Sequence, residues 1–178
     1  MDIIIIFIGI IKIVLFIYME SPGIYHIREI TSNDFNKPDT ISLPIKQLYQ
    51  QLSSITIDKE KAEDLFKTLC NNPDRVYIGL FYMHNLKVKL VGITTLYIER
   101  KVIHNGQSVG HIEDVVIDQG HRGKKMGGSL INKAITIAKT HNCYKIILAC
   151  KEELEQTYTD MLIIHGKVKS QSSLSLYF

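Results

Sequence analysis

The sequence predicts one α/β domain built on a mixed, mostly antiparallel sheet that is flanked by helices. Two observations support this fold class. Short apolar runs with a period of two alternate along the chain with segments whose apolar residues recur at helical spacing. The length of 178 residues, with 46% hydrophobic residues and only four prolines, fits a single globular domain with a sizeable core.

The first elements are a strand and a pair of helices. Residues 24–30 place apolar side chains at every second position, which predicts a strand, and a polar loop with proline follows it. Residues 43–52 and 59–69 carry apolar residues at helical spacing. Asp58 stands at the N-cap position of the second helix, and the Asn-Asn-Pro sequence at 71–73 ends that helix.

Three antiparallel strands are predicted next. Residues 75–83 and 89–99 are rich in β-forming residues, and the four-residue connection 84–87 between them is typical of a hairpin. A second turn at Asn105 and Gly106 leads into a further strand at residues 109–118.

The last predicted elements are a loop, a helix and a strand. The glycine-bearing loop 120–128 opens a helix with an apolar stripe made of Leu130, Ile131, Ala134, Ile135 and Ala138. Residues 144–150 form the next strand. Because the sequence has no internal repeats and no linker after residue 20, we expect one folded domain over residues 20–178.

Residues 1–19 form a separate hydrophobic leader, in which the apolar run 3–18 is broken only by Lys12. As a membrane anchor it is slightly short, and a central lysine costs about 2.5–3.5 kcal/mol on insertion. As a signal peptide it lacks a basic start and a small-residue cleavage site. A third interpretation is a mispredicted start, with Met19 as the natural first residue. Any membrane contact would therefore come from residues 3–18.

The charge and the cysteines argue against several classes of protein. The formal net charge of +3 is mild, so we expect no nucleic-acid partner. The three cysteines, Cys70, Cys143 and Cys150, are odd in number and form no C-x-x-C pair, which favours neither a disulfide framework nor a zinc site. We expect reduced thiols in a cytoplasmic protein without a metal. The basic residues are dense only at His121, Arg122, Lys124 and Lys125.

That basic cluster lies in a glycine-rich loop before a helix, and this combination favours phosphate binding. Glycines at 123, 127 and 128 let backbone N–H groups turn toward a ligand, and a helix N-terminus carries about half a positive charge. The glycine spacing fits neither a Walker A loop nor a dinucleotide-binding fingerprint. The alternative interpretation is a solvated basic turn that caps a helix.

Two adjacent carboxylates, Glu113 and Asp114, interrupt the apolar strand 109–118. In strict alternation one of them must face each side of the sheet, and a buried carboxylate without a partner is costly. A ligand pocket or a bulge in the strand explains the pair. An edge strand or a structural ion pair is the alternative.

The stretch from Arg122 to Gly127 resembles the coenzyme A pyrophosphate loop of GNAT acetyltransferases, an Arg-x-x-Gly-x-Gly pattern between a strand and a helix. Lys125 stands here at the position of the first of those glycines. Three further segments are similar to the glucosamine 6-phosphate N-acetyltransferase branch of the family: residues 98–104 (IERKVIH), 110–115 (GHIEDV) and 142–146 (NCYKI). The similarity covers residues 93–150, and residues 20–92 resemble the family in pattern only.

The resemblance implies a GNAT-type acyl-CoA N-acyltransferase domain. Its substrates would be acetyl-CoA and D-glucosamine 6-phosphate, and its product would feed UDP-N-acetylglucosamine synthesis. The coenzyme would contact Val115, Val116, Ile117, Arg122, Gly123, Lys124, Lys125, Met126, Gly127 and Gly128. The amino sugar and its phosphate would contact Lys101, Val102, Ile103, His104, Glu113, Asp114, Tyr144 and Lys145.

The implied mechanism is direct attack of the substrate amine on the thioester. Glu113, Asp114 or a water would remove the proton, and Tyr158 would protonate the departing thiolate. The alternative for Tyr158 is an ordinary helix-surface tyrosine. The family also implies a homodimer, in which Tyr144 and Lys145 can come from the partner subunit.

The C-terminal end departs from the family pattern. Leu154 and Thr157 replace an asparagine and a phenylalanine, residues 162–163 replace a Gly-aromatic pair, and residues 170–178 contain no arginine for the sugar phosphate. The last strand of the family is therefore expected to be altered or missing. Two other functions stay open, a GNAT enzyme for a polyamine or protein amine and a noncatalytic acyl-CoA-binding protein.

Overall fold

The computed structural model describes residues 23–36, 38–56 and 58–170. The hydrophobic leader, with its predicted membrane contact, and residues 171–178 lie outside these ranges. The chain divides between Ile147 and Leu148 into two compact units, which are described separately. Within the described ranges, none of the helices has the length and apolar character that crossing a bilayer requires.

A five-stranded sheet forms the centre of the first unit, with the order β1-β2-β3-β4-β5. Neighbouring strands from β1 to β4 pair antiparallel. The strands are β1 (Ile24–Ile30), β2 (Arg75–His84), β3 (Lys87–Arg100), β4 (Ser108–Ile117) and β5 (Cys143–Leu148). This architecture confirms the predicted α/β fold with a mostly antiparallel sheet.

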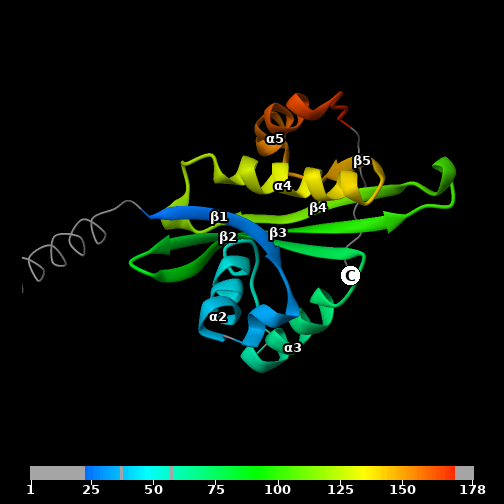
Figure 1. The fold of residues 1–178 in the computed structure, drawn as a ribbon. Coiled ribbons are helices and arrows are strands. Elements are labelled where there is room, and N and C mark those ends of the chain that lie inside the picture. The colour runs from blue at the N-terminus through cyan, green and yellow to red at the C-terminus, as the bar shows by residue number, and fades with distance from the viewer. Residues whose placement is uncertain (1–22, 37, 57, 171–178) are drawn as a thin grey trace, which may run out of the picture. The chain divides into compact units, whose positions relative to one another are not determined.

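Helices cover both faces of the sheet, as Figure 1 shows. Helices α2 (Pro38–Tyr49) and α3 (Lys59–Cys70) lie on one face, and α4 (Met126–Thr140) lies on the other. In the second unit, α5 (Glu155–Leu162) follows a short 3₁₀ turn, and no strand is described between residues 149 and 170. Short 3₁₀ turns span Ser32–Asn36, His104–Gly106, Gln119–His121, Glu152–Leu154 and Ile163–His165.

Two local predictions need correction. Helix α2 begins at Pro38, inside the predicted proline-bearing loop, because the first turn of a helix needs no N–H donor from proline. The connection between β2 and β3 is also shorter than the predicted four residues. It consists of Asn85 and Leu86, whose φ angles of 49° and 59° belong to a two-residue turn that matches the twist of paired strands.

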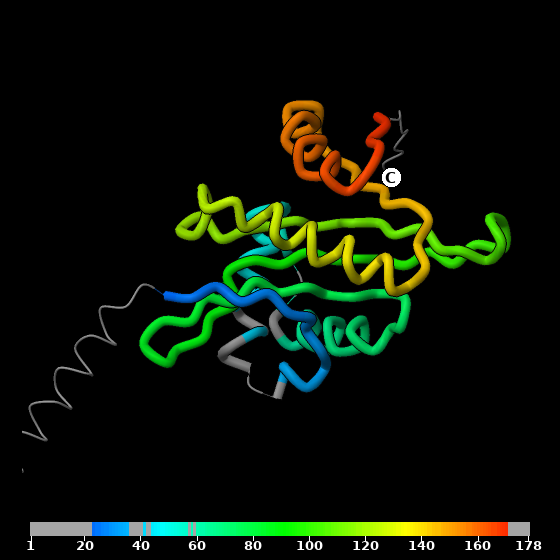
Figure 2. Tube along the Cα trace, turned by 45° about the horizontal axis from the view of Figure 1, so that its top comes forward, coloured from blue at the N-terminus to red at the C-terminus, as the bar shows by residue number. Residues whose placement is uncertain are grey.

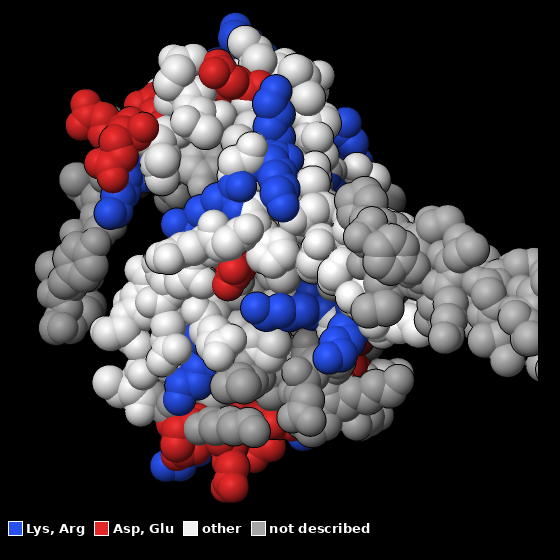
Figure 3. All heavy atoms as spheres, turned by 90° about the vertical axis from the view of Figure 1, so that its left-hand side faces the viewer, with Lys and Arg blue, Asp and Glu red and all other residues white. Residues whose placement is uncertain are grey.

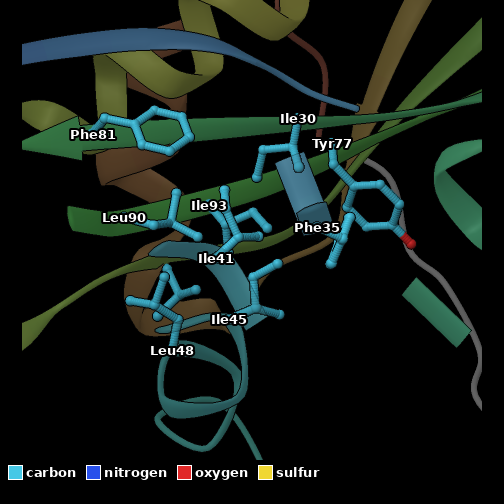
Figure 4. Packing of buried hydrophobic residues seen from close by; sticks show 10 residues of the cluster. Ile30, Phe35, Ile41, Ile45, Leu48, Tyr77, Phe81, Leu90 and Ile93 are labelled. Carbon is cyan, nitrogen blue, oxygen red and sulfur yellow. The ribbon is translucent and has the colours of Figure 1, made fainter. Parts of the chain in front are cut away.

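The main core lies between the sheet and α2 (Figure 4). Aliphatic side chains of α2 pack against aromatic and branched residues of the strands, and the buried cluster consists of Ile30, Phe35, Ile41, Ile45, Leu48, Tyr77, Phe81, Leu90, Ile93 and Val116. On the opposite face, α4 buries the predicted stripe of Leu130, Ile131, Ala134, Ile135 and Ala138. The two layers hold β4 between them, so the position of β4 is fixed from both sides.

Candidate active site

A β-bulge interrupts β4 at the predicted acidic pair. Two residues of β4, Asp114 and Val115, lie opposite Thr94 of β3, where regular pairing would place one. Asp114 has φ 55°, a left-handed conformation that is uncommon outside glycine. The Thr94 hydroxyl donates a hydrogen bond of 2.9 Å to the carbonyl oxygen of Glu113 and fixes the strand beside the bulge. The bulge ends the strict alternation, so neither acid has to point into the core.

Glu113 lines an open hollow of about 440 Å³ on the surface of the sheet. The other lining residues come from three neighbouring strands: Arg75, Tyr97, Glu99 and His111. Tyr97 lies directly opposite Arg75 on one side and His111 on the other. None of these four was predicted as a site residue. Two signals pointed to some of them: Glu99 and His111 lie in the family-like segments 98–104 and 110–115, and the period of two places Tyr97 with Glu99, and His111 with Glu113, on one face.

Glu99 carries the ion-pair contacts of the hollow. Glu99 forms ion pairs with Lys101 and with Nε2 of His111, the latter at 3.1 Å. The hydrogen bond from Lys101, and then the one from His111, holds the pKa of Glu99 below its usual value. Arg75 places its guanidinium 5.8 Å from the centre of the Tyr97 ring. Its Nε atom is buried, and no described residue accepts a hydrogen bond from it.

The two acids of the bulge hold their protons more tightly than usual. Burial, and then the neighbouring Asp114, raises the pKa of Glu113. Burial also raises the pKa of Asp114, while Arg75 acts in the opposite direction. Both residues stay accessible to solvent. A carboxylate with a raised pKa is a stronger base, so either can take a proton from an amine.

The start of α4 presents backbone N–H groups without a capping side chain. Lys125 occupies the N-cap with φ 58° and forms no side-chain cap, and the first turn holds no acidic residue. Gly123 turns the preceding loop with φ 78°. Figure 3 views the molecule from the end where α4 begins and shows several Lys and Arg side chains on this face. N–H donors without a capping side chain, the helix dipole and positive charge together fit the phosphates of a coenzyme.

The other predicted coenzyme residues lie along β4 and the loop. Val116 is only 3% exposed, so its side chain belongs to the core and only its main chain can face a ligand. Val115 and Ile117 are half-buried. Arg122 is anchored to the protein: its Nε donates to the Ile117 carbonyl oxygen, and a terminal nitrogen donates to Gln51 Oε1, both at 2.8 Å.

The predicted phosphate-binding residues gather around the tip of the β3–β4 hairpin, which projects from the sheet (Figure 2). The His104 and Tyr144 rings lie 4.3 Å apart, centre to centre, and Lys145 Nζ lies 5.8 Å from the Tyr144 ring centre. Lys101 pairs with Glu99 toward the hollow. Val102 and Ile103 are 99% and 63% exposed. The fold therefore brings residues 101–104 and 144–145 together within one chain.

Tyr158 and Cys143 have ordinary environments. Tyr158 lies half-buried on α5 in the second unit, where burial and then Cys150 raise the pKa of its hydroxyl. Its role as the proton donor stays a prediction. Burial raises the pKa of Cys143, which leaves it a poor nucleophile. Among the described residues, no group of three or more His, Cys, Asp or Glu side chains is placed to hold a metal ion.

Comparison with known proteins identifies relatives of this chain. The sequence model of the acetyltransferase (GNAT) family matches residues 43–158. A probable glucosamine 6-phosphate N-acetyltransferase of Oryza sativa is 36% identical over 90 residues, 51% of this chain and 52% of that protein. Glucosamine 6-phosphate N-acetyltransferase 1 of Dictyostelium discoideum is 30% identical over 125 residues, 70% of this chain and 75% of that protein.

A solved structure shows the same fold. The crystal structure of glucosamine 6-phosphate N-acetyltransferase from Arabidopsis thaliana superimposes with a TM-score of 0.71 and 26% identity, over 87% of this chain and 99% of that one. In sequence, the chain spans about half the length of the rice relative.

The raised pKa of Glu113 predicts a gain in stability on substitution. Because the folded state binds this proton more tightly than the unfolded state, Glu113 favours folding below the unfolded pKa, and this contribution is lost as pH rises through the folded pKa. Glu113→Gln should therefore raise Tm at pH 7.5 and not at pH 4. Since the side chain is partly exposed, solvent screening limits the gain to about 1–2 °C.

Thermal unfolding followed by circular dichroism at both pH values would measure this shift. Glu99→Gln is the matched control, because its pKa is lowered and its loss should not raise Tm at pH 7.5. An equal or lower Tm for Glu113→Gln at pH 7.5 would contradict a raised pKa of Glu113 in the folded protein.

Proposed function

The chain belongs to the acetyltransferase (GNAT) family, and on that basis we propose that it transfers the acetyl group of acetyl-CoA to the amine of D-glucosamine 6-phosphate. The product would be N-acetylglucosamine 6-phosphate, a precursor for UDP-N-acetylglucosamine. The names of the rice, Dictyostelium and Arabidopsis relatives support this choice of amine.

One observation carries the proposal. The adjacent acids Glu113 and Asp114 lie at the bulge of β4, and a single loop connects β4 to the start of α4, which has no capping side chain. The acids supply a base, and the helix start supplies an anion site. A transferase that moves an acetyl group from a coenzyme thioester to an amine uses both groups, a base for the amine and an anion site for the coenzyme phosphates. The residues of the loop fit the coenzyme phosphates through free N–H groups and positive charge.

The bulge residues perform the proton transfer in the proposed mechanism. Glu113 or Asp114, directly or through a water, takes a proton from the substrate ammonium, and the free amine then attacks the thioester carbonyl. The bulge takes Asp114 and Val115 out of the regular ladder, so a main-chain N–H there can donate to the developing oxyanion. As the C–S bond breaks, Tyr158 gives its proton to the leaving thiolate, and the second proton of the attacking nitrogen passes through water to the Tyr158 phenolate.

Cationic side chains at the β3–β4 hairpin would recognise the sugar phosphate. Lys101, His104 and Lys145 are donors suited to a dianion, and they lie around the exposed Tyr144 ring and the rim of the hollow. With its phosphate bound at this place, the sugar would direct its amine toward the carboxylates of the bulge. We assign the reaction to the cytoplasm, the compartment that three unpaired cysteines favour.

The choice of amine is tested by following release of CoA thiol. The full chain, supplied with acetyl-CoA, should release thiol with glucosamine 6-phosphate and far more slowly with glucosamine or spermidine. Faster release with spermidine or a peptide amine would identify a different GNAT enzyme. Coenzyme binding without release for any amine would identify a noncatalytic member of the family.

Lys101→Met should weaken recognition of the phosphate. We expect KM for glucosamine 6-phosphate to rise about tenfold, the range for losing a charge-assisted hydrogen bond, with kcat nearly unchanged. KM for acetyl-CoA should not move. Lys151→Met, which removes an exposed lysine of the second unit, is the matched control. A rise in KM for acetyl-CoA instead would contradict the placement of Lys101.

We also propose a homodimer formed through the β3–β4 hairpin. Val102 and Ile103 expose apolar side chains at its tip, 99% and 63% accessible, beside the partly exposed Tyr144. Burial of such side chains against a second copy would remove apolar surface from water. Sedimentation velocity should give a dimer of the 20.4 kDa chain.

In the same experiment, the double variant Val102→Asp with Ile103→Asp should sediment as a monomer. Leu86→Asp, at the exposed turn between β2 and β3, is the control and should remain a dimer. A monomeric unsubstituted chain, or a dimer in the double variant, would count against this interface.

A further inference from the structure

The hydroxyl of Tyr25 lies at the centre of a small hydrogen-bonded network. Lys124 Nζ donates to the Tyr25 oxygen at 2.9 Å, and the same oxygen lies 2.8 Å from Nδ1 of His121. An ammonium can only donate, so Tyr25 accepts from Lys124 and has its own proton left for His121. When the Tyr25 hydroxyl donates to Nδ1, the imidazole is neutral and carries its proton on Nε2. Burial lowers the pKa of His121, which favours that neutral form.

Aromatic packing holds Tyr25 in place. Its ring centre lies 4.9 Å from that of Tyr82 and 5.8 Å from that of His121, and the Tyr82 and His121 rings lie 4.8 Å apart in an edge contact. The ammonium of Lys124 also lies 5.3 Å from the centre of the Tyr25 ring. Figure 2 shows the start of β1, in blue, at the same end of the fold as the loop that opens α4. Residues about a hundred positions apart thus support one loop.

The loop before α4 is anchored at two points by its own basic side chains. Arg122 is bonded to the end of β4 and to Gln51, as described above, and Lys124 is bonded to Tyr25 of β1. Gly123, between the two anchors, takes a positive φ. Both side chains are therefore engaged with the protein, while the N–H groups at the start of α4 have no capping side chain.

We propose that Tyr25 is a positioning residue for coenzyme binding, which ties Lys124 to His121 and so holds the backbone N–H groups of the loop toward the coenzyme phosphates. Lys124 then acts mainly as a support of the loop and not as a direct phosphate ligand. This inference rests on the proposed use of acetyl-CoA, and it differs from the expectation that every basic residue of the loop contacts the coenzyme. Because preorganised donors are already held in place, binding an anion does not cost the conformational entropy of ordering a mobile loop.

The test is acetyl-CoA binding to the full chain, measured by isothermal titration calorimetry without any amine. Tyr25→Phe changes no charge, yet it should raise Kd about fivefold, as expected for lost hydrogen bonds of ordinary strength. Lys124→Met should raise Kd by a similar factor. If both changes break the same support, the double variant should be no more than about twofold weaker than either single variant. Tyr82→Phe is the control, since it removes a hydroxyl from the same aromatic group, and its Kd should stay within about twofold of the original.

Kinetics separate positioning from a general loss of fold. For Tyr25→Phe, KM for acetyl-CoA should rise while kcat and KM for the amine stay unchanged. An unchanged Kd for Tyr25→Phe, or independent and additive losses for Tyr25→Phe and Lys124→Met, would overturn the inference. If the unsubstituted chain binds acetyl-CoA but acetylates no glucosamine 6-phosphate, the proposed reaction is wrong, and the comparison of Kd values still tests the role of Tyr25. Failure of the unsubstituted chain to bind acetyl-CoA would overturn both proposals.

Discussion

The bulge in β4 is the constraint on which the candidate site depends. An extra residue beside Thr94 puts Asp114 into a left-handed conformation and lets two adjacent carboxylates avoid the core. Such a conformation is unfavourable outside glycine, so the surrounding sheet has to hold it. The Thr94 hydrogen bond and the packed layers on both faces of β4 supply that support.

Much of the fold could be predicted from the sequence, because local periodicity reports which side of an element is buried. The strand at residues 24–30 has its predicted bounds, the apolar stripe of α4 is buried as expected, and Asp58 caps α3 by accepting from the Lys61 N–H at 2.8 Å. The start of α2 was missed because proline at a helix start resembles proline in a loop. Membership of the GNAT family, inferred from short matching segments, is confirmed by the match over residues 43–158.

The candidate site could be predicted only in part. Glu113 and Asp114 are conspicuous within one strand, since charge interrupts an apolar run. Arg75 and His111 are not conspicuous in the sequence, because they come together only when three strands pair. The register of that pairing depends on contacts between distant segments. The interactions of Lys124 were hidden for the same reason, as its partner Tyr25 lies far away in sequence.

The strand order has a consequence for how the protein folds. Each strand from β1 to β5 pairs with its neighbour in sequence, and β2 and β3 are joined by a two-residue turn. Closing such short loops loses little chain entropy, so the β2–β3–β4 meander is expected to form early. The bulge lies inside this meander, whereas the loop before α4 also needs β1, which the whole helical pair separates from β2. The acids would therefore be set in place before the coenzyme loop acquires its anchor, which makes coenzyme affinity a late property of folding.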